Sequence, residues 1–348
     1  MLVKSKERIA NIELLRGIAS IGVCVVHLQM FSGYTQFPVI DKLINGGQLG
    51  VYVFFMVSGF ILPYSLYKNN YRLKDFFTFL FKRNLRIDPP YFIVLILSIF
   101  ILQFENFSIQ NFIFNLLYLV PFVKGAYWYD TLFWTLGIEM QFYILLGLVF
   151  PLFKQIPPLV TLIILVILFH FVIYIEFGYG RSFIIESLTF FIVGTIMFMV
   201  YKRLVNFTLG ITILFVLCIE WSFLVAIRYT LISIPTVALV LLFKPFKQKI
   251  GFFLGQISYS LYLTHILVAG LTINPLMALG ISPFACFIIQ ISLSILVAKL
   301  YYQFIERYFI RCSKKIPYHR DKKSNFGLFQ KRTFKRSFFL WRPFFKKA

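Results

Sequence analysis

Charged residues are scarce in this chain of 348 residues. They make up 14% of it, and the acidic ones are fewest, with 13 Asp and Glu against 35 Lys and Arg. A soluble globular protein carries about 25% charged residues, because its surface must contact water. The shortage argues against the two soluble domains that this length would otherwise suggest. The four cysteines are too few for a disulfide scaffold and form no CxxC pair, so we expect neither disulfides nor a metal site.

Apolar residues take the place of the missing charges. Hydrophobic residues make up 59% of the chain, including 45 Phe, and they fall in long continuous runs. Such a composition excludes a disordered or collagen-like chain. Continuous runs differ from the alternating pattern of a membrane β-barrel, and about 18 or more apolar residues in a row are typical of a transmembrane helix. The sequence therefore predicts an all-α, polytopic bundle of transmembrane helices.

Ten runs are close to the length of about 20 residues that crosses a bilayer. We expect the spans near residues 9–30, 46–67, 88–104, 130–153, 159–176, 183–201, 207–227, 229–243, 250–272 and 280–304. The eighth run is short for a span. A further apolar stretch at 112–123 is shorter still, and we interpret it as a re-entrant or interfacial segment.

The positions of Lys and Arg predict the orientation of the spans. Basic residues gather at the N-terminus, in the loops after spans two, four, six and eight, and after span ten, whereas the opposite loops hold only Lys42, Lys124, Arg181 and Arg228. Cytoplasmic loops carry the excess of Lys and Arg in membrane proteins. We therefore expect a multi-pass protein of the plasma (inner) membrane with both the N- and the C-terminus in the cytoplasm.

The formal net charge of +22 comes in large part from one tail. Residues 311–348 hold 13 Lys and Arg against the single Asp321. A basic segment next to a membrane span is attracted to anionic lipid, so we expect the lipid bilayer, and no nucleic acid, as its partner. We accordingly divide the chain into a transmembrane domain at 1–310 and a basic cytoplasmic tail at 311–348.

Titratable residues inside the predicted spans are candidates for function, because a charge within a bilayer is costly. Arg16 and His27 both lie in the first span. The eleven steps between them end about 20° past three full turns, so both side chains share one face, about 16 Å apart along the axis. Taken alone, the pair also fits a snorkelling arginine and a satisfied core histidine. His170 and Glu186 belong to no motif, and we expect local roles for them.

Two arginines precede the third predicted span. Arg83 and Arg86 are three residues apart and share a face of a helical turn, where they repel each other unless an anion lies between them. Two neighbouring guanidinium groups are typical of a phosphate site. The ordinary positive charge of a cytoplasmic loop would also explain them.

Three other spans add polar candidates. Glu139 in the fourth span needs a partner, which a protonated histidine or an arginine would supply. The second span carries Ser58, and the ninth carries Tyr259, Ser260 and His265. Serine and tyrosine often only join helices by hydrogen bonds, so we regard these four residues as either acceptor-binding or structural.

The motifs around these residues follow one another in a definite order. They are LRGIA at 15–19 with His27 after it, GVYVFFMVSGF at 50–60, RNLRIDP at 83–89, WTLGIEMQFY at 134–143, SYSLYL at 258–263 with His265, and finally Glu306. Together they resemble the acyltransferase-3 family, the integral-membrane O-acyltransferases of bacterial envelopes and some eukaryotes. Members of that family commonly have Asp at the position of Glu13 and Pro at that of Tyr308.

The resemblance implies an enzyme that transfers an acyl group, often acetyl, from cytoplasmic acyl-CoA to a hydroxyl of a cell-surface or exported carbohydrate. On this interpretation Arg83 and Arg86 hold the nucleotide phosphates, and Arg16 lines the route of the donor. His27 acts as general base or relays the acyl group, and Glu139 orients it or stabilises its imidazolium. We expect no bound cofactor, since acyl-CoA is the donor substrate.

Two other functions fit the same number of spans. A transporter that exports an envelope precursor is compatible with ten spans and few buried charges, and so is a scaffold for other envelope enzymes. A transporter has no need of a phosphate clamp at one end of the bundle and a base toward the other, which favours the enzyme. We see no second domain of the esterase-like kind that fused relatives carry, and we leave open whether an extracytoplasmic partner enzyme completes the transfer.

Overall fold

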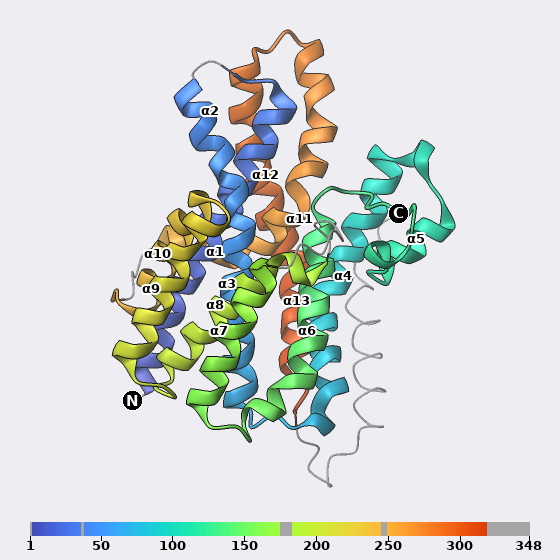
Figure 1. The fold of residues 1–348 in the computed structure, drawn as a ribbon. Helices are drawn as coiled ribbons and strands as arrows, with labels where there is room; N and C mark the ends of the chain where they lie inside the picture. The colour runs from blue at the N-terminus through green and yellow to red at the C-terminus, as the bar shows by residue number, and fades with distance from the viewer. Residues whose placement is uncertain (1, 36–37, 175–182, 245–248, 319–348) are drawn as a thin grey trace.

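The computed structural model describes residues 2–35, 38–174, 183–244 and 249–318, and the side chains of 2–10 and 39 lie outside this description. The described residues form helices and turns, with no strand among them. The predicted all-α bundle is confirmed (Figure 1). Most of the predicted basic tail, 319–348, lies outside the described residues.

Within the described residues, ten apolar helices occupy the positions of the ten predicted spans. They are α1 (Leu2–Ser32), α3 (Gly50–Lys68), α4 (Phe76–Leu102), α6 (Phe133–Phe153), α7 (Pro158–Tyr174), α8 (Leu188–Tyr201), α9 (Phe207–Leu224), α10 (Ile227–Leu241), α11 (Lys249–Ala278) and α12 (Pro283–Tyr301). Eight helical segments are long and apolar enough to cross a membrane, and α7 and α10 are shorter apolar helices of 17 and 15 residues.

Shorter elements lie between and after these helices. They are α2 (Pro38–Asn45), α5 (Ile109–Leu116), a π-helical segment (Tyr302–Glu306) and α13 (Arg307–Lys314). The stretch 112–123 contains the end of α5 and a 3-10 turn at Val120–Phe122. It forms no spanning helix, as its length predicted.

The third span begins earlier than predicted. We expected it near 88–104, but α4 starts at Phe76. Arg83 and Arg86 therefore lie within the helix and not in a loop before it. The apolar first residues of α4, at 76–81, are separated from its long apolar run by the polar stretch 82–88, and two consecutive prolines follow that stretch inside the helix although proline usually ends one.

Small residues bring the central helices into backbone contact. A Cβ added to Gly255 of α11 would meet the carbonyl group of Glu13 on α1, and one added to Gly194 of α8 would meet the carbonyl oxygen of Met56 on α3. Such contacts are typical of helix pairs in membranes, where close van der Waals packing takes the place of a hydrophobic driving force. The pairs α1–α11 and α3–α8 accordingly make the most extensive contacts in the bundle.

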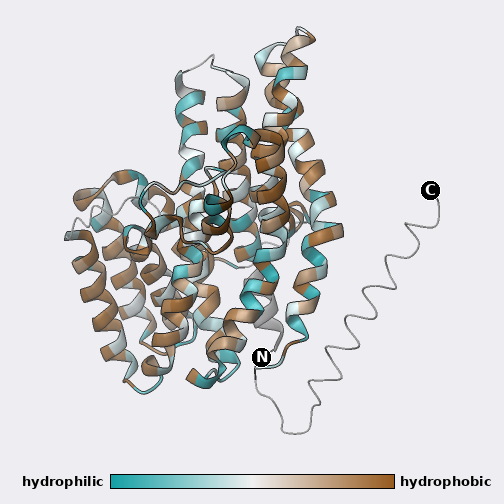
Figure 2. Ribbon diagram, turned by 90° about the vertical axis from the view of Figure 1, so that its right-hand side faces the viewer, coloured by the Kyte–Doolittle hydropathy of each residue, from teal (hydrophilic) through white to brown (hydrophobic). Residues whose placement is uncertain are grey.

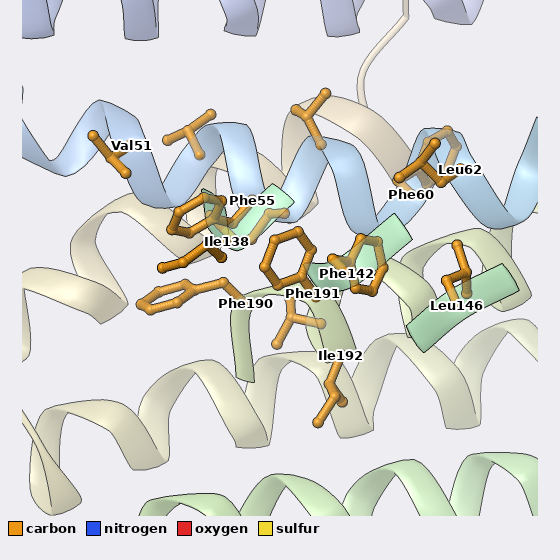
Figure 3. Packing of buried hydrophobic residues seen from close by; sticks show 14 of the residues in the cluster. Val51, Phe55, Phe60, Leu62, Ile138, Phe142, Leu146, Phe190, Phe191 and Ile192 are labelled. Carbon is orange, nitrogen blue, oxygen red and sulfur yellow. The ribbon is translucent and has the colours of Figure 1, made fainter. Parts of the chain in front are cut away.

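Aromatic rings fill the space between α3, α6 and α8 (Figure 3). Phe191 of α8 stacks on Phe142 of α6 with ring centroids 4.0 Å apart, and its centroid lies 5.0 Å from that of Phe55 on α3. All three rings are buried. Aromatic pairs at such distances contribute about 0.5–1.5 kcal/mol each beyond the burial of their area. This core holds the face of α6 that carries Glu139 against the face of α3 that carries Ser58.

Large apolar side chains also cover the outside of the bundle. Phe77, Phe100 and Phe223 have exposed fractions of 81%, 65% and 83%. The helices are mostly apolar along their length, and hydrophilic residues gather at helix ends and turns (Figure 2). A soluble monomer rarely exposes so much contiguous apolar surface, and lipid chains are its natural cover. The molecule is a multi-pass membrane protein.

Several turns that are rich in Lys and Arg lie together at one end of the bundle. Lys154 after α6 donates a hydrogen bond from Nζ to the carbonyl oxygen of Tyr71, between α3 and α4, at 3.1 Å. Lys82 of α4 donates to the carbonyl oxygen of Ile316, after α13. The first residues of α1 lie at the same end, which is the lower one in Figure 1. We name it the basic end, and its location in the cytoplasm stays a prediction from the loop charges.

A carboxyl group is buried in the segment between α4 and α6. Asp130 is 4% exposed, and its Oδ1 accepts a hydrogen bond from the backbone N–H of Leu132 at 2.9 Å. Its Oδ2 has no hydrogen-bond partner among the described residues. Burial raises the pKa of Asp130 to about 7, because the charged form loses its hydration.

We expect Asp130→Asn to stabilise the protein at about pH 8 and to have little effect near about pH 4. The unfolded carboxyl group ionises above about pH 4, but the folded one only above about pH 7, so stability falls as pH rises between these values and stays reduced above them. The measurement is the midpoint of thermal unfolding in detergent, where 1 kcal/mol corresponds to roughly 2–4 °C. The exposed Glu105→Gln is the control, and equal midpoints of Asp130→Asn and wild type at the higher pH would contradict the expectation.

Candidate active site

A cavity of about 660 Å³ lies between α1, α3, α4, α6 and α11. Volumes of about 300–1,000 Å³ are usual for small-molecule sites, and charged residues inside a membrane bundle indicate a functional site because burying them is costly. Six of the nine site residues that the sequence predicted line it: Arg16, Ser58, Arg83, Arg86, Glu139 and Tyr259. The structure thus brings together residues from five helices that the sequence could only propose separately.

Three arginines give the cavity its positive charge. Nη1 of Arg16 lies 3.5 Å from Oε2 of Glu13, one turn earlier on α1. Arg83 and Arg86 of α4 both line the cavity, as their spacing predicted. Arg86 is within electrostatic range of the other two arginines and of Glu306. Three guanidinium groups around one volume form a site for an anion such as a phosphate.

Two lysines extend the positive lining to the basic end. Lys68 is the last residue of α3 and Lys314 the last of α13, and both line the cavity. Tyr64 and Tyr201 line it nearby, with ring centroids 5.9 Å apart. We name this region the lysine mouth. The sequence placed Lys314 in the basic tail at 311–348 and did not single out Lys68, because only the fold shows that the ends of α3 and α13 meet.

Glu139 joins α6 to α3 through hydrogen bonds. Ser58 Oγ donates to Oε1 of Glu139 at 3.0 Å, and Tyr143 OH donates to Oε2 at 2.7 Å. The sequence-based hypothesis made Glu139 the partner of His27, but the structure places its carboxylate in the wall of the arginine cavity with these two hydroxyl groups. Tyr143 follows Glu139 by one helical turn, and that spacing was the signal that could have identified it.

The two polar residues Tyr259 and Ser260 of α11 link helices. Tyr259 OH donates to the carbonyl oxygen of Ile87 at 2.9 Å, which fastens α11 to α4. Ser260 Oγ donates to Oε2 of Glu306 at 2.6 Å. Of the two, Tyr259 also lines the cavity, whereas Ser260 is completely buried behind it.

Glu306 is a buried carboxylate that the sequence marked only as a motif position. It is 1% exposed and is the last residue of the π-helical segment after α12. Such segments are rare and frequent at functional sites, because the wider turn changes the direction of a side chain. The carboxylate accepts the hydrogen bond of Ser260 and is within electrostatic range of Arg86 and Arg16, whose charges it offsets.

His27 and His265 lie side by side, although they are 238 residues apart in the chain. Nε2 of His265 lies 3.2 Å from Nδ1 of His27, and the ring centroids are 5.2 Å apart. His265 is completely buried and His27 is half-buried. No spacing in the sequence predicted this contact, which depends on the packing of α1 against α11.

Tyr262 and Phe54 separate the histidine pair from the cavity. Both line the cavity, and their ring centroids are 5.8 Å apart. Tyr262 contacts His265 on its other side, with centroids 6.2 Å apart, and its hydroxyl group lies 2.8 Å from Oγ1 of Thr135. Neither histidine belongs to the lining of the cavity. The rings of Phe54 and Tyr262, which we name the aromatic wall, line the cavity in this conformation, and the histidine that the sequence-based hypothesis places on the donor route lies outside that lining.

A further titratable pair lies away from the cavity. Nε2 of His170 on α7 is 3.0 Å from Oε2 of Glu220 on α9, and about a third of each side chain is exposed, at 35% and 33%. Sequence analysis overlooked Glu220 as a charge inside a span. Glu186, in the 3-10 segment Ile184–Ser187, lies before α8. The pair joins two peripheral helices, in line with the local role expected of His170.

Comparison with protein families places this arrangement in a known class. A family model described as an acyltransferase domain, that of the acyltransferase-3 family, matches residues 9–302. The chain belongs to this family of membrane acyltransferases, as the order of its motifs predicted. All nine predicted site residues lie within the matched region.

The individual relatives that match the chain share about a quarter of its residues. The O-acetyltransferase OatA of Staphylococcus aureus strain NCTC 8325 is 24% identical over 364 aligned positions, which cover 87% of this chain and 57% of that protein. The proteins of strains COL and MRSA252 give the same values. The chain thus spans 57% of the length of the curated relatives it matches. No solved structure matches the chain.

Ser58 offers a test of where the cavity opens. We expect a Ser58→Cys variant, in a Cys312→Ser background, to react with a charged, membrane-impermeant thiol reagent in inverted membrane vesicles and not in intact cells. The lysine mouth lies at the basic end, and the other three cysteines are buried. Ser98→Cys is the control, because Ser98 is completely buried outside the cavity and should not react. Labelling of the Ser58→Cys variant in intact cells alone would contradict this opening.

Proposed function

We propose that this protein is a membrane-bound O-acyltransferase that moves an acyl group, most often acetyl, from cytoplasmic acyl-CoA to a hydroxyl of a cell-surface or exported glycan. The observation that carries the proposal is a cavity with three arginines and a lysine mouth at one end of the bundle, backed on its inner side by a histidine pair. Membership of the acyltransferase-3 family and the O-acetyltransferase relatives support the same chemistry.

The charges of the cavity suit acyl-CoA as the donor. Coenzyme A carries a diphosphate and a separate 3′-phosphate, joined to the thioester by a thin pantetheine arm. The three arginines offer guanidinium groups that bind phosphate with two parallel hydrogen bonds each, and Lys68 and Lys314 add point charges at the mouth. The arm would then run inward past Ser58 and Glu139 toward the aromatic wall.

Glu139 serves the donor side in this proposal. Its carboxylate, held by Ser58 and Tyr143, offsets part of the arginine charge within the bilayer, where unbalanced guanidinium groups would be costly. Because its two oxygens already accept these hydrogen bonds, it orders the donor cavity. His27 depends on a different partner.

His27 supplies the base for the transfer step. It takes the proton of the acceptor hydroxyl while the hydroxyl oxygen attacks the carbonyl carbon of the thioester. The carbon–sulfur bond breaks, CoA leaves as the thiolate, and the proton passes from the imidazole to the sulfur. The products are the glycan ester and free CoA. Histidine suits this exchange because the side chain normally titrates near neutral pH.

The aromatic wall must open for the thioester to reach His27. Rotation of Phe54 and Tyr262 would connect the cavity with the histidine pair, and it would break the contact of the Tyr262 hydroxyl group with Thr135. It would also break the longer hydrogen bond from this hydroxyl group to the carbonyl oxygen of Leu132, at 3.4 Å. Each such bond contributes about 0.5–1.5 kcal/mol net, so the barrier is small on the time scale of turnover. Binding of the pantetheine arm against the wall would supply that free energy.

The acceptor belongs to the outer end of the bundle, beyond the histidine pair. Lipopolysaccharide, capsule, exopolysaccharide and peptidoglycan all carry suitable hydroxyl groups, and a separate extracytoplasmic enzyme could complete delivery. Mass analysis of surface glycans with and without the gene identifies the acceptor through the loss of one acyl group per site.

We expect His27→Ala to lower acyl transfer by roughly 10²-fold or more at wild-type membrane levels, because the step loses its base. The measurement is CoA released and glycan ester formed by membranes supplied with acetyl-CoA. His170→Ala is a matched control, since His170 is also a half-buried histidine of an apolar helix. If His27→Ala still acylates the acceptor at normal rates, the proposal is wrong.

Two acyl donors that differ in the 3′-phosphate distinguish which residues contact which phosphate. We expect Arg83→Ala and Arg86→Ala to raise KM for acetyl-CoA by roughly 10-fold or more, since each removes charge-assisted hydrogen bonds of about 1.5–3 kcal/mol. The double variant Lys68→Ala, Lys314→Ala should raise KM for acetyl-CoA but not for the acetyl thioester of dephospho-CoA, which lacks the 3′-phosphate. Lys154→Ala, a basic-end lysine outside the cavity lining, should change neither. Equal effects of the double variant on both donors would rule out a 3′-phosphate contact at the mouth.

An exporter of an envelope precursor is the alternative function. It predicts that membranes containing the protein release no CoA from acetyl-CoA beyond the background. A scaffold predicts that alanine at Arg83, Arg86, His27 and Glu139 leaves the surface glycans unchanged. Measuring CoA release and surface glycan esters distinguishes both alternatives from a transferase.

A further inference from the structure

The contacts of the two imidazole rings determine where their protons lie. Nδ1 of His27 is 2.9 Å from the carbonyl oxygen of Val23, and Nδ1 of His265 is 2.8 Å from that of Leu261. A carbonyl oxygen only accepts hydrogen bonds, so each of these nitrogens must carry a hydrogen. In the neutral form of each ring, Nε2 then has a lone pair and no hydrogen.

This assignment gives the contact between the rings a direction. Nε2 of His265 accepts, and Nδ1–H of His27 donates to it at 3.2 Å while also pointing at the carbonyl oxygen of Val23. The reverse direction would require hydrogens on both nitrogens of a neutral His265. Nε2 of His27 therefore keeps its lone pair, and none of the hydrogen bonds among the described residues engages it.

The hydrogen-bond acceptor of the pair, His265, is also the more deeply buried of the two rings. His265 is 0% exposed on the face of α11 that meets α1, and its neighbours on α11 are fixed by the Thr264 and Ser260 hydrogen bonds. His27 is only half-buried. The ring of His265 is thus fixed by its surroundings, and the ring of His27 offers one free nitrogen to an approaching group.

We propose that His265 is the positioning residue of the transfer reaction: together with the carbonyl oxygen of Val23 it holds His27 in the tautomer with the hydrogen on Nδ1, so that Nε2 of His27 is the atom that takes the acceptor proton. This inference rests on the proposed function. The carboxylate that orients a catalytic histidine in many hydrolases is here replaced by a second imidazole, which accepts the same hydrogen bond without bringing a net charge into the bilayer.

The proton balance of the step follows from this arrangement. When Nε2 of His27 takes the hydroxyl proton, the ring becomes an imidazolium with a hydrogen on each nitrogen. Its Nδ1–H continues to donate to Nε2 of His265 and to the carbonyl oxygen of Val23, so neither contact has to break. The proton on Nε2 then returns to the departing CoA sulfur, and His265 itself gains and loses none.

The substitutions that test the proposal differ in whether they keep an acceptor at the position of Nε2. Glutamine reaches this position with its side-chain oxygen, whereas leucine has no acceptor and asparagine is too short. We expect His265→Leu and His265→Asn to lower kcat for acetyl transfer by roughly 10- to 100-fold, the usual cost of losing an orienting partner, with KM for acetyl-CoA unchanged within about two-fold. His265→Gln should retain kcat within a few-fold.

A spectroscopic signature separates positioning from simple packing. In protein labelled with 15N-histidine, the signals of His27, assigned by their loss in His27→Ala, should report a protonated Nδ1 and a bare Nε2 in the wild type and in His265→Gln. In the Leu and Asn variants only the carbonyl oxygen of Val23 still holds the hydrogen on Nδ1, so we expect the second tautomer to appear beside the first. If the Leu variant does not fold, the Asn and Gln variants still give the comparison.

Two results would overturn the proposal. One is full kcat in the Leu or Asn variant. The other is equal loss in all three variants with the tautomer of His27 unchanged, which would mean that His265 only fills space. The proposed function is tested separately, because His27→Ala must be inactive whatever the His265 variants show. An active His27→Ala protein would end both proposals, whereas inactive His27→Ala with active His265→Leu would end only this one.

Discussion

Backbone contact between α1 and α11 is the constraint on which the rest of the site depends. Glycine at 255 lets α11 approach the carbonyl group of Glu13, and Gly17 lets α1 approach Leu254. A Cβ at either position would push the helices apart by the width of a methyl group. Two imidazole rings at a distance of 3.2 Å tolerate no such shift, because a hydrogen bond weakens steeply once it is stretched. The same contact aligns the α1 and α11 walls of the cavity.

Charge within the bundle is balanced over several helices. Three arginines face one cavity, and the carboxylates within reach come from Glu13 on α1, Glu139 on α6 and Glu306 after α12. Each carboxylate has a hydrogen bond or ion pair of its own, so none is left bare in a medium of low polarity. The excess of positive charge that remains is what an anionic donor would neutralise. Binding and stability are therefore linked in this site.

Local patterns explain which parts could be predicted. Apolar runs mark spanning helices, and the three-residue spacing of Arg83 and Arg86 fixes their common face whatever surrounds them. Other contacts depend on which helices pack together, and no spacing in the sequence encodes that. They are the contact of His27 with His265 and that of Ser58 with Glu139, which are 81 positions apart. The start of α4 was missed for another reason: a polar stretch at 82–88 and two prolines interrupt its apolar pattern, although the helix continues through them.

The aromatic wall has a consequence for the membrane itself. A bundle with a continuous wet passage from one face to the other would leak protons and collapse the electrochemical gradient that the bilayer sustains. Phe54 and Tyr262 line the cavity, and neither histidine belongs to that lining. A wall of these two rings between the cavity and the histidines would keep the water on the two sides apart. A slender acyl arm can push between two rings and plug the gap it makes. The bundle would thus stay closed to protons while each acyl group passes through it.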